Sequence, residues 1–298
     1  MRLLSILASF VAALAIVLLI FGCVKEKSAL SNTGGLEDVK ARTQTYKSEV
    51  EQLRLRLANL ESQIASATER LTVLQNRENY KTEPTAFLTF DVAFTANTKE
   101  ILKVLDEAGL KGTFFVIGEL IENNASAQAL LKEAAAKGHK IGIRSYKNSV
   151  STMYESEEAY FEDLYRCKDL LKNILGTEPV LVRMPGGTGT ADIKLSKNTK
   201  NDDTLEKILD RMTTEGFIVN DWSVNSLDTD YNTDLADAVT SSLNSSKKYL
   251  STTYKTNIVL FSDEKRTYRM LPDIIEGLRT QGFAFSTLPS SIVIARQR

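Results

Sequence analysis

The stretch that decides the fold begins with the hexapeptide AFLTFD at residues 86–91 and continues to Ile117. Residues 98–108 have the spacing of an amphipathic helix, which Gly109 ends, and residues 112–117 (GTFFVI) form a second apolar run. Two buried strands joined by a helix are typical of a parallel β-α-β unit. The stretch therefore predicts a parallel sheet that is covered by helices.

The same alternation continues over the rest of the chain. Further strands are predicted at 140–143, 180–183, 217–222, 258–261 and 284–288, and further helices at 125–137, 155–175, 204–215, 236–249 and 271–281. This pattern predicts an α/β domain over residues 82–298, with a parallel sheet that is either open or closed into a barrel. Function in such folds lies at the carboxyl ends of the strands. The polar stretch 188–203 is expected to be an inserted mobile loop at the rim of that edge.

The amino-terminal segment, residues 1–25, predicts a connection to a membrane. Residues 3–24 carry no charge and are long enough to span a bilayer as a helix. The length favours a retained signal anchor over a cleaved signal peptide. A second interpretation is that Ile20 to Cys23 form a lipobox, so that Cys23 carries the lipid. Both interpretations place the rest of the chain at the cell membrane of a bacterium, facing the extracytoplasmic side.

Residues 36–78 have apolar side chains at alternating spacings of three and four. With Leu36 at heptad position a, the pattern predicts a coiled coil, and a parallel homodimer is the favoured assembly. The pairs Glu49/Arg54 and Arg56/Glu61 would attract across such a dimer, whereas Arg42/Lys47 would repel. The alternative is a single amphipathic helix that lies on the domain or on another protein.

Composition excludes several classes of function. The 298 residues carry a formal net charge of -1, so no electrostatic feature favours nucleic acid as a partner. Cys23 and Cys167 are the two cysteines, and the first lies in the membrane segment, so no internal disulfide framework is expected. Cys167 is expected to be a buried small hydrophobe. The one histidine, His139, excludes any site with several histidines.

Ordered motifs over residues 85–289 resemble those of the NodB-like polysaccharide deacetylases. Residues 89–94 (TFDVAF) stand where that family has Thr-Phe-Asp-Asp-Gly-Pro, and residues 112–118 (GTFFVIG) are similar to its second strand. The other matches are 138–148 (GHKIGIRSYKN), 183–187 (RMPGG), 222–228 (WSVNSLD) and 258–263 (IVLFSD). The resemblance implies a distorted (β/α) barrel that is preceded by a membrane helix and a coiled-coil helix.

The resemblance also implies a divalent metal held by one aspartate and two histidines, and none of these is kept. The three ligand positions hold Val92, Arg144 and Asn148, which are poor donors for zinc. The general acid of the family is replaced by Ser262, and the aspartate that tunes it by Asn225. We therefore predict no metal and no other cofactor.

Two positions of the family's catalytic machinery are retained, namely Asp91 as the base and Arg183 as the residue that orients it. The guanidinium of Arg144 is expected to replace the metal by pairing with Asp91, which would be a structural role. The resemblance also implies binding positions at the cleft, where Tyr146 and Trp222 are candidates for a sugar-stacking wall; these positions are Tyr146, Pro185, Gly186, Trp222 and Leu260.

Three functions follow from these residues. The first is a tethered pseudoenzyme that binds cell-wall glycan or a protein partner. The second is a working hydrolase that removes N-acetyl groups from cell-wall polysaccharide, with a weak zinc or other divalent metal on ligands such as Asp91, Asp228 or Asp263. The third is a scaffold in which the coiled coil is the functional element.

Overall fold

The computed structural model describes residues 36–200, 203–290 and 293–295. The chain divides into two compact units, Met1–Thr68 and Glu69–Arg298. The predicted membrane segment at residues 3–24 lies outside the described residues. Within the described ranges, no helix is both long enough and apolar enough to cross a membrane.

Residues Leu36–Thr82 form one helix, α2, which confirms the helical part of the prediction for 36–78. The heptad positions Tyr46, Leu53, Leu57, Leu60, Ile64 and Leu71 are between 38% and 62% exposed. The predicted helix is therefore present in one chain. Its pairing with a second helix in a coiled coil stays a prediction.

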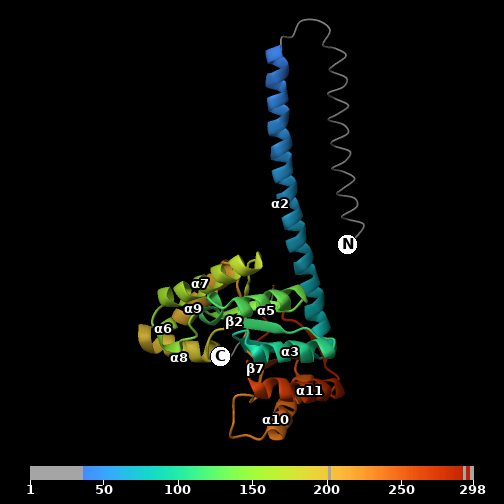
Figure 1. Ribbon diagram of the computed structural model, residues 1–298, viewed down its shortest axis with the longest axis vertical. Helices are drawn as coiled ribbons and strands as arrows, with labels where there is room; N and C mark the ends of the chain where they lie inside the picture. Colours follow the sequence, from blue (N-terminus) through green and yellow to red (C-terminus); the bar gives the residue numbers. More distant parts are fainter. Residues whose placement is uncertain (1–35, 201–202, 291–292, 296–298) are drawn as a thin grey trace. The chain divides into compact units, whose positions relative to one another are not determined.

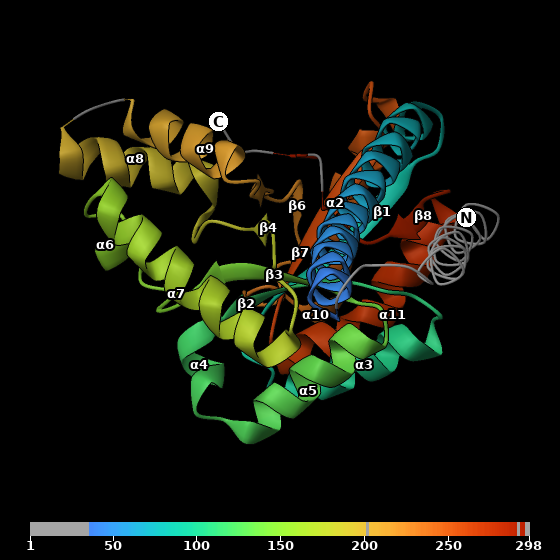
Figure 2. The same ribbon diagram turned by 90° about the horizontal axis from the view of Figure 1, so that it is seen from above.

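The second unit is built on a parallel sheet, shown in Figures 1 and 2. Its strands follow the order β5-β4-β3-β2-β1-β7-β6, and β8 pairs with β1. Every pairing is parallel, and the sheet is open between β5 and β6. The strands are β1 (Thr85–Val92), β2 (Thr113–Ile117), β3 (Lys140–Ser145), β4 (Leu181–Val182), β5 (Ile218–Val219), β6 (Val224–Asn225), β7 (Thr256–Ser262) and β8 (Ala284–Ser286).

Helices connect most successive strands, as the alternation predicts, but β5 and β6 are joined by residues 220–223 without a helix. The single strand predicted at 217–222 is therefore wrong, because the chain leaves the sheet after Val219 and re-enters it at Val224. Among the helices, α3 packs against α11 and α11 against α10, while α5 packs against α7. The helices are α3 (Ala96–Glu107), α4 (Gly118–Glu122), α5 (Ala125–Ala136), α6 (Val150–Met153), α7 (Glu157–Leu175), α8 (Gly187–Thr199), α9 (Thr204–Thr214), α10 (Leu235–Lys247) and α11 (Lys265–Thr280), with a 3-10 turn η1 (Lys248–Ser251).

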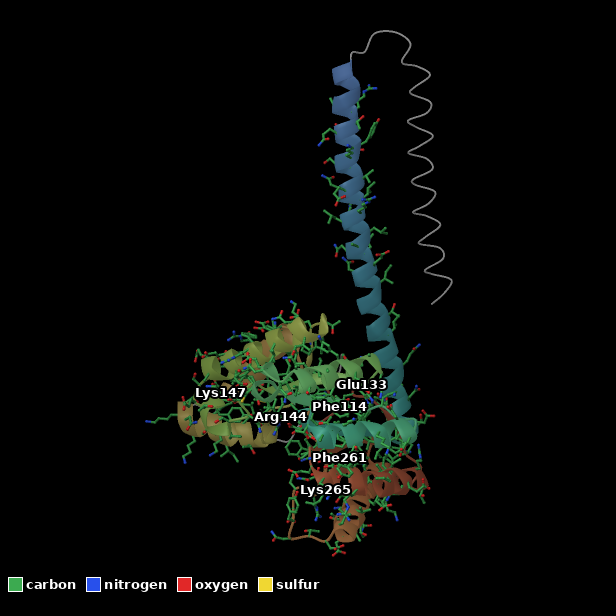
Figure 3. All side chains as sticks on the ribbon, viewed as in Figure 1. Phe114, Glu133, Arg144, Lys147, Phe261 and Lys265 are labelled. Carbon is green, nitrogen blue, oxygen red and sulfur yellow. The ribbon has the colours of Figure 1, made fainter. Side chains whose placement is uncertain are left out.

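The two faces of β1 build two apolar layers because successive side chains point to opposite sides of a strand. Leu88 and Phe90 belong to the large layer between the sheet and the helices. The ring centroid of Phe90 lies 4.8 Å from that of Phe114 and 5.2 Å from that of Phe261. Figure 3 labels Phe114 and Phe261. Phe87 belongs to a smaller cluster on the other face. The odd-numbered residues of β1 thus face the inside of the curved sheet, where the candidate site lies.

The last described residues lie beside the opening of the sheet. The amide of Ile294 donates to Asn220 Oδ1 at 2.6 Å, and the amide of Asp221 donates to the carbonyl of Ala295 at 2.9 Å. Asn220 and Asp221 directly follow β5. The segment 294–295 therefore supplies partners for backbone and side-chain groups at the open edge.

The predicted mobile loop at 188–203 is wrong, because α8 covers Gly187–Thr199. Ala191 and Leu195 are fully buried on one side of this helix, whereas Asp192, Ile193 and Lys194 are exposed. Two apolar residues four positions apart are enough to attach a helical face to the core. The charged residues Asp192 and Lys194, and an apolar Ile193 that faces solvent, conceal this face in the sequence.

Helix α11 is longer than the predicted 271–281 and begins at Lys265. Pro272 suggests a first helical turn, since proline is preferred there and disfavoured inside a helix. The buried residues Thr267, Met270, Ile274 and Leu278 nevertheless form one continuous stripe. Burial of that stripe outweighs the lost backbone hydrogen bond at Pro272.

Candidate functional site

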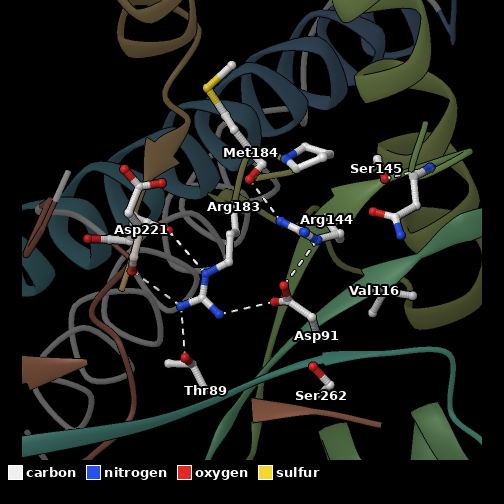
Figure 4. A network of polar contacts seen from close by, with 12 residues as sticks. Thr89, Asp91, Val116, Arg144, Ser145, Arg183, Met184, Asp221 and Ser262 are labelled. Carbon is white, nitrogen blue, oxygen red and sulfur yellow. Dashed lines mark hydrogen bonds and ion pairs between the residues drawn. The ribbon is translucent and has the colours of Figure 1, made fainter. Parts of the chain in front are cut away.

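The carboxyl ends of β1, β3, β4 and β7 bring the predicted polar residues to one edge of the sheet. Asp91 lies opposite Ser262 in the pairing of β1 with β7. Arg144 is near the end of β3, and Arg183 directly follows β4. Residues that are far apart in the sequence thus meet here because all four strands run in the same direction (Figure 4).

Arg183 lies at the centre of this site and is completely buried. Its NH1 atom donates to Asp91 Oδ1 at 3.1 Å, and its NH2 atom donates to Thr89 Oγ1 at 2.8 Å. The same side chain reaches the carbonyl oxygens of Asn220 and Asp221, at 3.4 and 3.3 Å. Burial lowers the pKa of Arg183, and the neighbouring carboxylate of Asp91 opposes that effect.

Arg183 also packs on aromatic rings. Its guanidinium carbon lies 4.3 Å from the ring centroid of Phe115 and 5.8 Å from that of Trp222. Cation–π contacts are more favourable where water is excluded. Arg183 therefore joins β1, β4 and the segment after β5, and its position is set by polar and aromatic partners together.

Arg144 pairs with the other oxygen of Asp91. The distance from Arg144 Nε to Asp91 Oδ2 is 3.1 Å, and the side chains are 13% and 12% exposed. The Nε–H group is not aligned for a hydrogen bond, so this contact is an ion pair only. The NH1 atom of Arg144 donates to the carbonyl of Met184 at 2.8 Å. The structure therefore contains the Arg144–Asp91 pair that the sequence predicts.

Two polar residues beside Arg183 were not identified from the sequence. Thr89 accepts from Arg183 and donates to the carbonyl of Val259 at 2.8 Å. The carboxylate of Asp221, also fully buried, accepts from the amide and the hydroxyl of Thr188 at the start of α8. The period of two along β1 would have placed Thr89 on the same face as Asp91. No pattern in the sequence identifies Asp221.

The residues at the family's metal-ligand positions do not converge on Asp91 as ligands. Val92 is fully buried in the large apolar layer, on the face of β1 opposite Asp91. Asn148 is exposed in the turn after β3 with φ of 52°, and its amide donates to Ser145 Oγ. Asp163 fixes this turn by accepting from the amides of Tyr146 and Lys147, at 2.5 and 2.9 Å.

The residues at the family's acid position have structural partners. The amide of Ser262 donates to Asp228 Oδ2 at 2.6 Å, and the hydroxyl of Thr267 donates to the same oxygen at 2.6 Å. Burial raises the pKa of Asp228, although these donors oppose the shift. Asn225 is exposed, and its side-chain oxygen accepts from the amide of Leu227. Asp228 thus holds the end of β7 against the segment that follows β6.

The predicted binding positions are less accessible than a sugar-stacking wall requires. Tyr146 is 4% exposed, and the guanidinium carbon of Arg166 lies 3.7 Å from its ring centroid. Trp222 is half-buried against the inner apolar cluster. Pro185 is buried and its carbonyl accepts from Tyr154, whereas Gly186 and Leu260 are half-buried.

The donors present do not fit a zinc ion. Among the residues that the structure describes, no group of three His, Cys, Asp or Glu side chains is close enough to hold a metal. Asp263 accepts from the amides of Ala93 and Thr95 and from the hydroxyl of Thr95. Asp228 and Asp91 are engaged as described above, so the three carboxylates that the hydrolase hypothesis needs serve three separate structural contacts.

The histidine lies just before β3, away from this edge, whereas the sulfur of the internal cysteine is 3.7 Å from the carbonyl oxygen of Val116 near the carboxyl end of β2. His139 accepts from the amide of Gly112 through Nδ1 at 3.0 Å and is 4% exposed. Its burial lowers the pKa of the imidazole to about 4. Cys167 is a free, buried thiol on α7, which confirms the prediction that it is a buried hydrophobe.

Comparisons with known proteins agree with this architecture. The family model described as polysaccharide deacetylase matches residues 78–201. The Bacillus subtilis protein YheN, named as a polysaccharide deacetylase, is 29% identical over 221 residues, which are 74% of this chain and 72% of YheN. A peptidoglycan-N-acetylglucosamine deacetylase of Bacillus cereus is 28% identical over 234 residues, covering 77% of this chain and 80% of that protein.

A solved structure shows the same arrangement. The catalytic domain of peptidoglycan N-acetylglucosamine deacetylase from Eubacterium rectale superposes with a TM-score of 0.62 at 25% identity, covering 72% of this chain and 93% of that domain. The open parallel sheet, the ordered motifs and these relatives point to one family. The chain carries a domain of the polysaccharide deacetylase family.

Proposed function

We propose that this protein is a non-catalytic member of its family that binds cell-wall glycan, or a protein partner, at the outer surface of the bacterial membrane. The observation that carries the proposal is the pairing of Asp91 with Arg144, the residue that stands at one of the family's histidine positions. The second partner of Asp91, Arg183, occupies its other oxygen. Both oxygens of the retained carboxylate are thus committed to cations of the protein itself.

This pairing opposes the chemistry of amide hydrolysis. A general base needs a carboxylate oxygen that can contact the attacking water, and Arg183 and Arg144 each contact one oxygen of Asp91. Ser262 has no basicity that would let it deliver a proton to an amine leaving group near neutral pH. The acid and the base of the reaction are therefore both impaired in this chain.

The alternative function is a working N-deacetylase with a metal on unconventional ligands. It requires Asp91, Asp228 or Asp263 to leave their present donors. Each buried hydrogen-bond donor that loses its carboxylate acceptor in this way would cost about 1–3 kcal/mol of folding stability. Among the described residues, the contacts of Asp91, Asp228 and Asp263 favour the first proposal over this alternative.

Glycan is the favoured ligand because of the relatives. The Bacillus cereus relative is a peptidoglycan-N-acetylglucosamine deacetylase by name, and its likeness extends over 77% of this chain. A shared fold does not by itself establish a ligand, so glycan is inferred from the relative and requires a binding test. We propose that residues 3–24, or a lipid on Cys23, hold the domain at the membrane and that residues 36–78 space it from there.

The test is a calorimetric zinc titration of residues 36–298 together with an acetate-release assay on N-acetylglucosamine oligomers. We expect no zinc binding at micromolar concentrations and no acetate. The matched variants are Asp91→Ala and Asp192→Ala, the latter an exposed carboxylate on α8. One equivalent of zinc that Asp91→Ala abolishes and Asp192→Ala preserves would show that the proposal is wrong and the hydrolase alternative right.

A further inference from the structure

An exposed tyrosine lies at the same edge of the sheet as the candidate site. Tyr231 is 66% exposed, although its ring is a large apolar surface. It belongs to the segment between β6 and α10, which follows the carboxyl end of β6. Its partner Glu264 is two residues beyond Ser262, which lies opposite Asp91 in the sheet.

The ring of Tyr231 is held in place although it is exposed. Its hydroxyl donates to Glu264 Oε2 at 2.9 Å, and the guanidinium carbon of Arg266 lies 5.4 Å from the ring centroid. Arg266 in turn donates to the carbonyl of Thr233 at 2.8 Å. With these contacts in place, 66% of Tyr231 is still exposed to solvent.

The turn that carries Tyr231 is also fixed. Asp230 accepts from the amide of Asn232 at 3.0 Å and from the hydroxyl of Thr233 at 2.6 Å. A rigid aromatic side chain loses little conformational entropy when a ligand covers it. Tyr231 is therefore an exposed side chain that is already held in one orientation, as a preorganised contact surface for a ligand would be.

Two further polar groups are associated with Tyr231: Glu264 contacts its hydroxyl, and Lys265 follows Glu264 in the sequence. Glu264 has a second carboxylate oxygen, for which no partner is present in the described part of the chain. Lys265, labelled in Figure 3, is exposed at the start of α11. An apolar ring next to an acceptor and a donor matches a pyranose, which has a C–H face and hydroxyl groups at its rim.

We propose that Tyr231, together with Glu264 at its hydroxyl and the following residue Lys265, is the platform on which a pyranose ring of the glycan stacks. This inference rests on the proposed glycan function and specifies where the sugar binds. It replaces the stacking wall of Tyr146 and Trp222, since Arg166 covers Tyr146 and the inner cluster half-buries Trp222.

The experiment is a calorimetric titration of residues 36–298 with a linear tetramer of N-acetylglucosamine. Tyr231→Ala removes the platform, whereas Tyr231→Phe keeps the ring and loses only the hydrogen bond to Glu264. Tyr254→Ala is the matched control, because Tyr254 is 36% exposed, has Lys81 5.7 Å from its ring centroid and precedes β7 at the opposite edge of the sheet. We expect about tenfold weaker binding for Tyr231→Ala, and near-original binding for the other two variants.

The outcomes separate the inference from the proposed function. If Tyr231→Ala binds the tetramer as tightly as the original chain does, the platform is wrong and the glycan function still stands. The same conclusion follows if Tyr254→Ala weakens binding as much as Tyr231→Ala does. No binding of the tetramer or of purified cell-wall sacculi by the original chain refutes the glycan function itself. Because Tyr231 is exposed, thermal unfolding should be unchanged in its variants, and that measurement checks their folding.

Discussion

Arg183 and Arg144 contact the same carboxylate but differ in what surrounds them. Arg183 is fully buried and has four oxygen partners on Thr89, Asp91, Asn220 and Asp221, whereas Arg144 is partly exposed and has Met184 and Asp91. Removing one member of a buried charge network leaves the others without compensation. The stability of the domain should therefore depend more on Arg183 than on Arg144.

We predict that Arg183→Ala lowers the free energy of unfolding by about 3–5 kcal/mol. Arg144→Ala should cost clearly less, because Asp91 keeps Arg183 and water reaches the vacated space. Urea denaturation of residues 36–298 measures both changes. Equal losses for the two variants would contradict this ranking of the two arginines.

The pH dependence of stability should contain a contribution from His139. Burial lowers the pKa of its imidazole in the folded protein to about 4 from the ordinary 6.5, with Lys111 acting in the same direction. The unfolded chain therefore binds this proton at a higher pH than the folded chain. Stability is lost as pH falls from about 6.5 to about 4, by at most about 3 kcal/mol, and the penalty is absent above this range.

We predict that His139→Asn reduces this pH dependence. Asparagine can still accept from the amide of Gly112 but does not titrate. Asp163 and Asp228, whose pKa values burial raises, contribute in the opposite direction, and they are present in both proteins. Urea midpoints at pH 7 and pH 4.5 should diverge less in the variant, and an unchanged difference would show that His139 is not responsible.

At the scale of elements, α2 differs from every helix of the sheet domain because its apolar heptad positions are exposed. Near its end the helix is buried instead: Tyr80 is 6% exposed and packs edge-to-face on Phe87, with ring centroids 5.7 Å apart. Its carbonyl accepts from the amide of Lys255 at 2.7 Å. The last turns of α2 therefore belong to the domain core, which agrees with a second unit that begins at Glu69.

The parallel dimer through 36–78 predicts a specific pattern of charge reversals. Glu49 at position g lies next to Arg54 at position e of the partner helix in a parallel pair. Glu49→Arg and Arg54→Glu should each weaken the dimer, since each creates like charges. The double variant should restore it, as measured by sedimentation equilibrium of residues 36–298.

An antiparallel pair or a single helix gives different results. Positions g and e of the same heptad interval do not meet in an antiparallel pair, so the double variant would bring no recovery. A monomer in all variants would support the alternative in which α2 lies on another protein. The charge pairs are worth only about 0.2–0.5 kcal/mol each in a helix, so the measurement needs protein concentrations near the dissociation constant.

At the scale of the whole molecule, the proposed function depends on the predicted position of the domain relative to the membrane. The uncharged segment 3–24 is the predicted anchor, and the helix 36–78 would extend for roughly 60 Å at the rise of an α-helix. A binding domain without turnover acts through where it is held. The anchor is thus as important to the proposed function as the glycan platform.

We predict that the full chain, expressed in a bacterium, is recovered in the membrane fraction and that a chain lacking residues 1–35 is not. Cys23→Ser should leave the full chain in the membrane, because an uncharged helix of this length needs no lipid. Release of Cys23→Ser from the membrane would favour the lipoprotein. Recovery of the unaltered chain in soluble form would refute the tether.

Much of the fold follows from short-range patterns. Strand β1 is an apolar run that is buried on both faces, and α7 ends at Gly176, whose φ of 73° suits glycine. Such signals depend on neighbours in sequence, which is why the alternation of strands and helices was predicted. Helix α8 was missed because its buried apolar residues Ala191 and Leu195 stand in a stretch rich in Lys, Asn and Asp, and its attachment to Asp221 is a contact across 33 positions.

The sequence by itself determined which residue stands at each motif position, and from these residues the replacement of the family's metal ligands and acid is predicted. Tertiary structure decided what the retained residues do. Asp91 and Arg183 are 92 positions apart, and their contact exists only because parallel strands end at one edge. The exposure of Tyr231 and the burial of Tyr146 were decided in the same way, because burial depends on which side chains cover a residue in space and not on its neighbours along the chain.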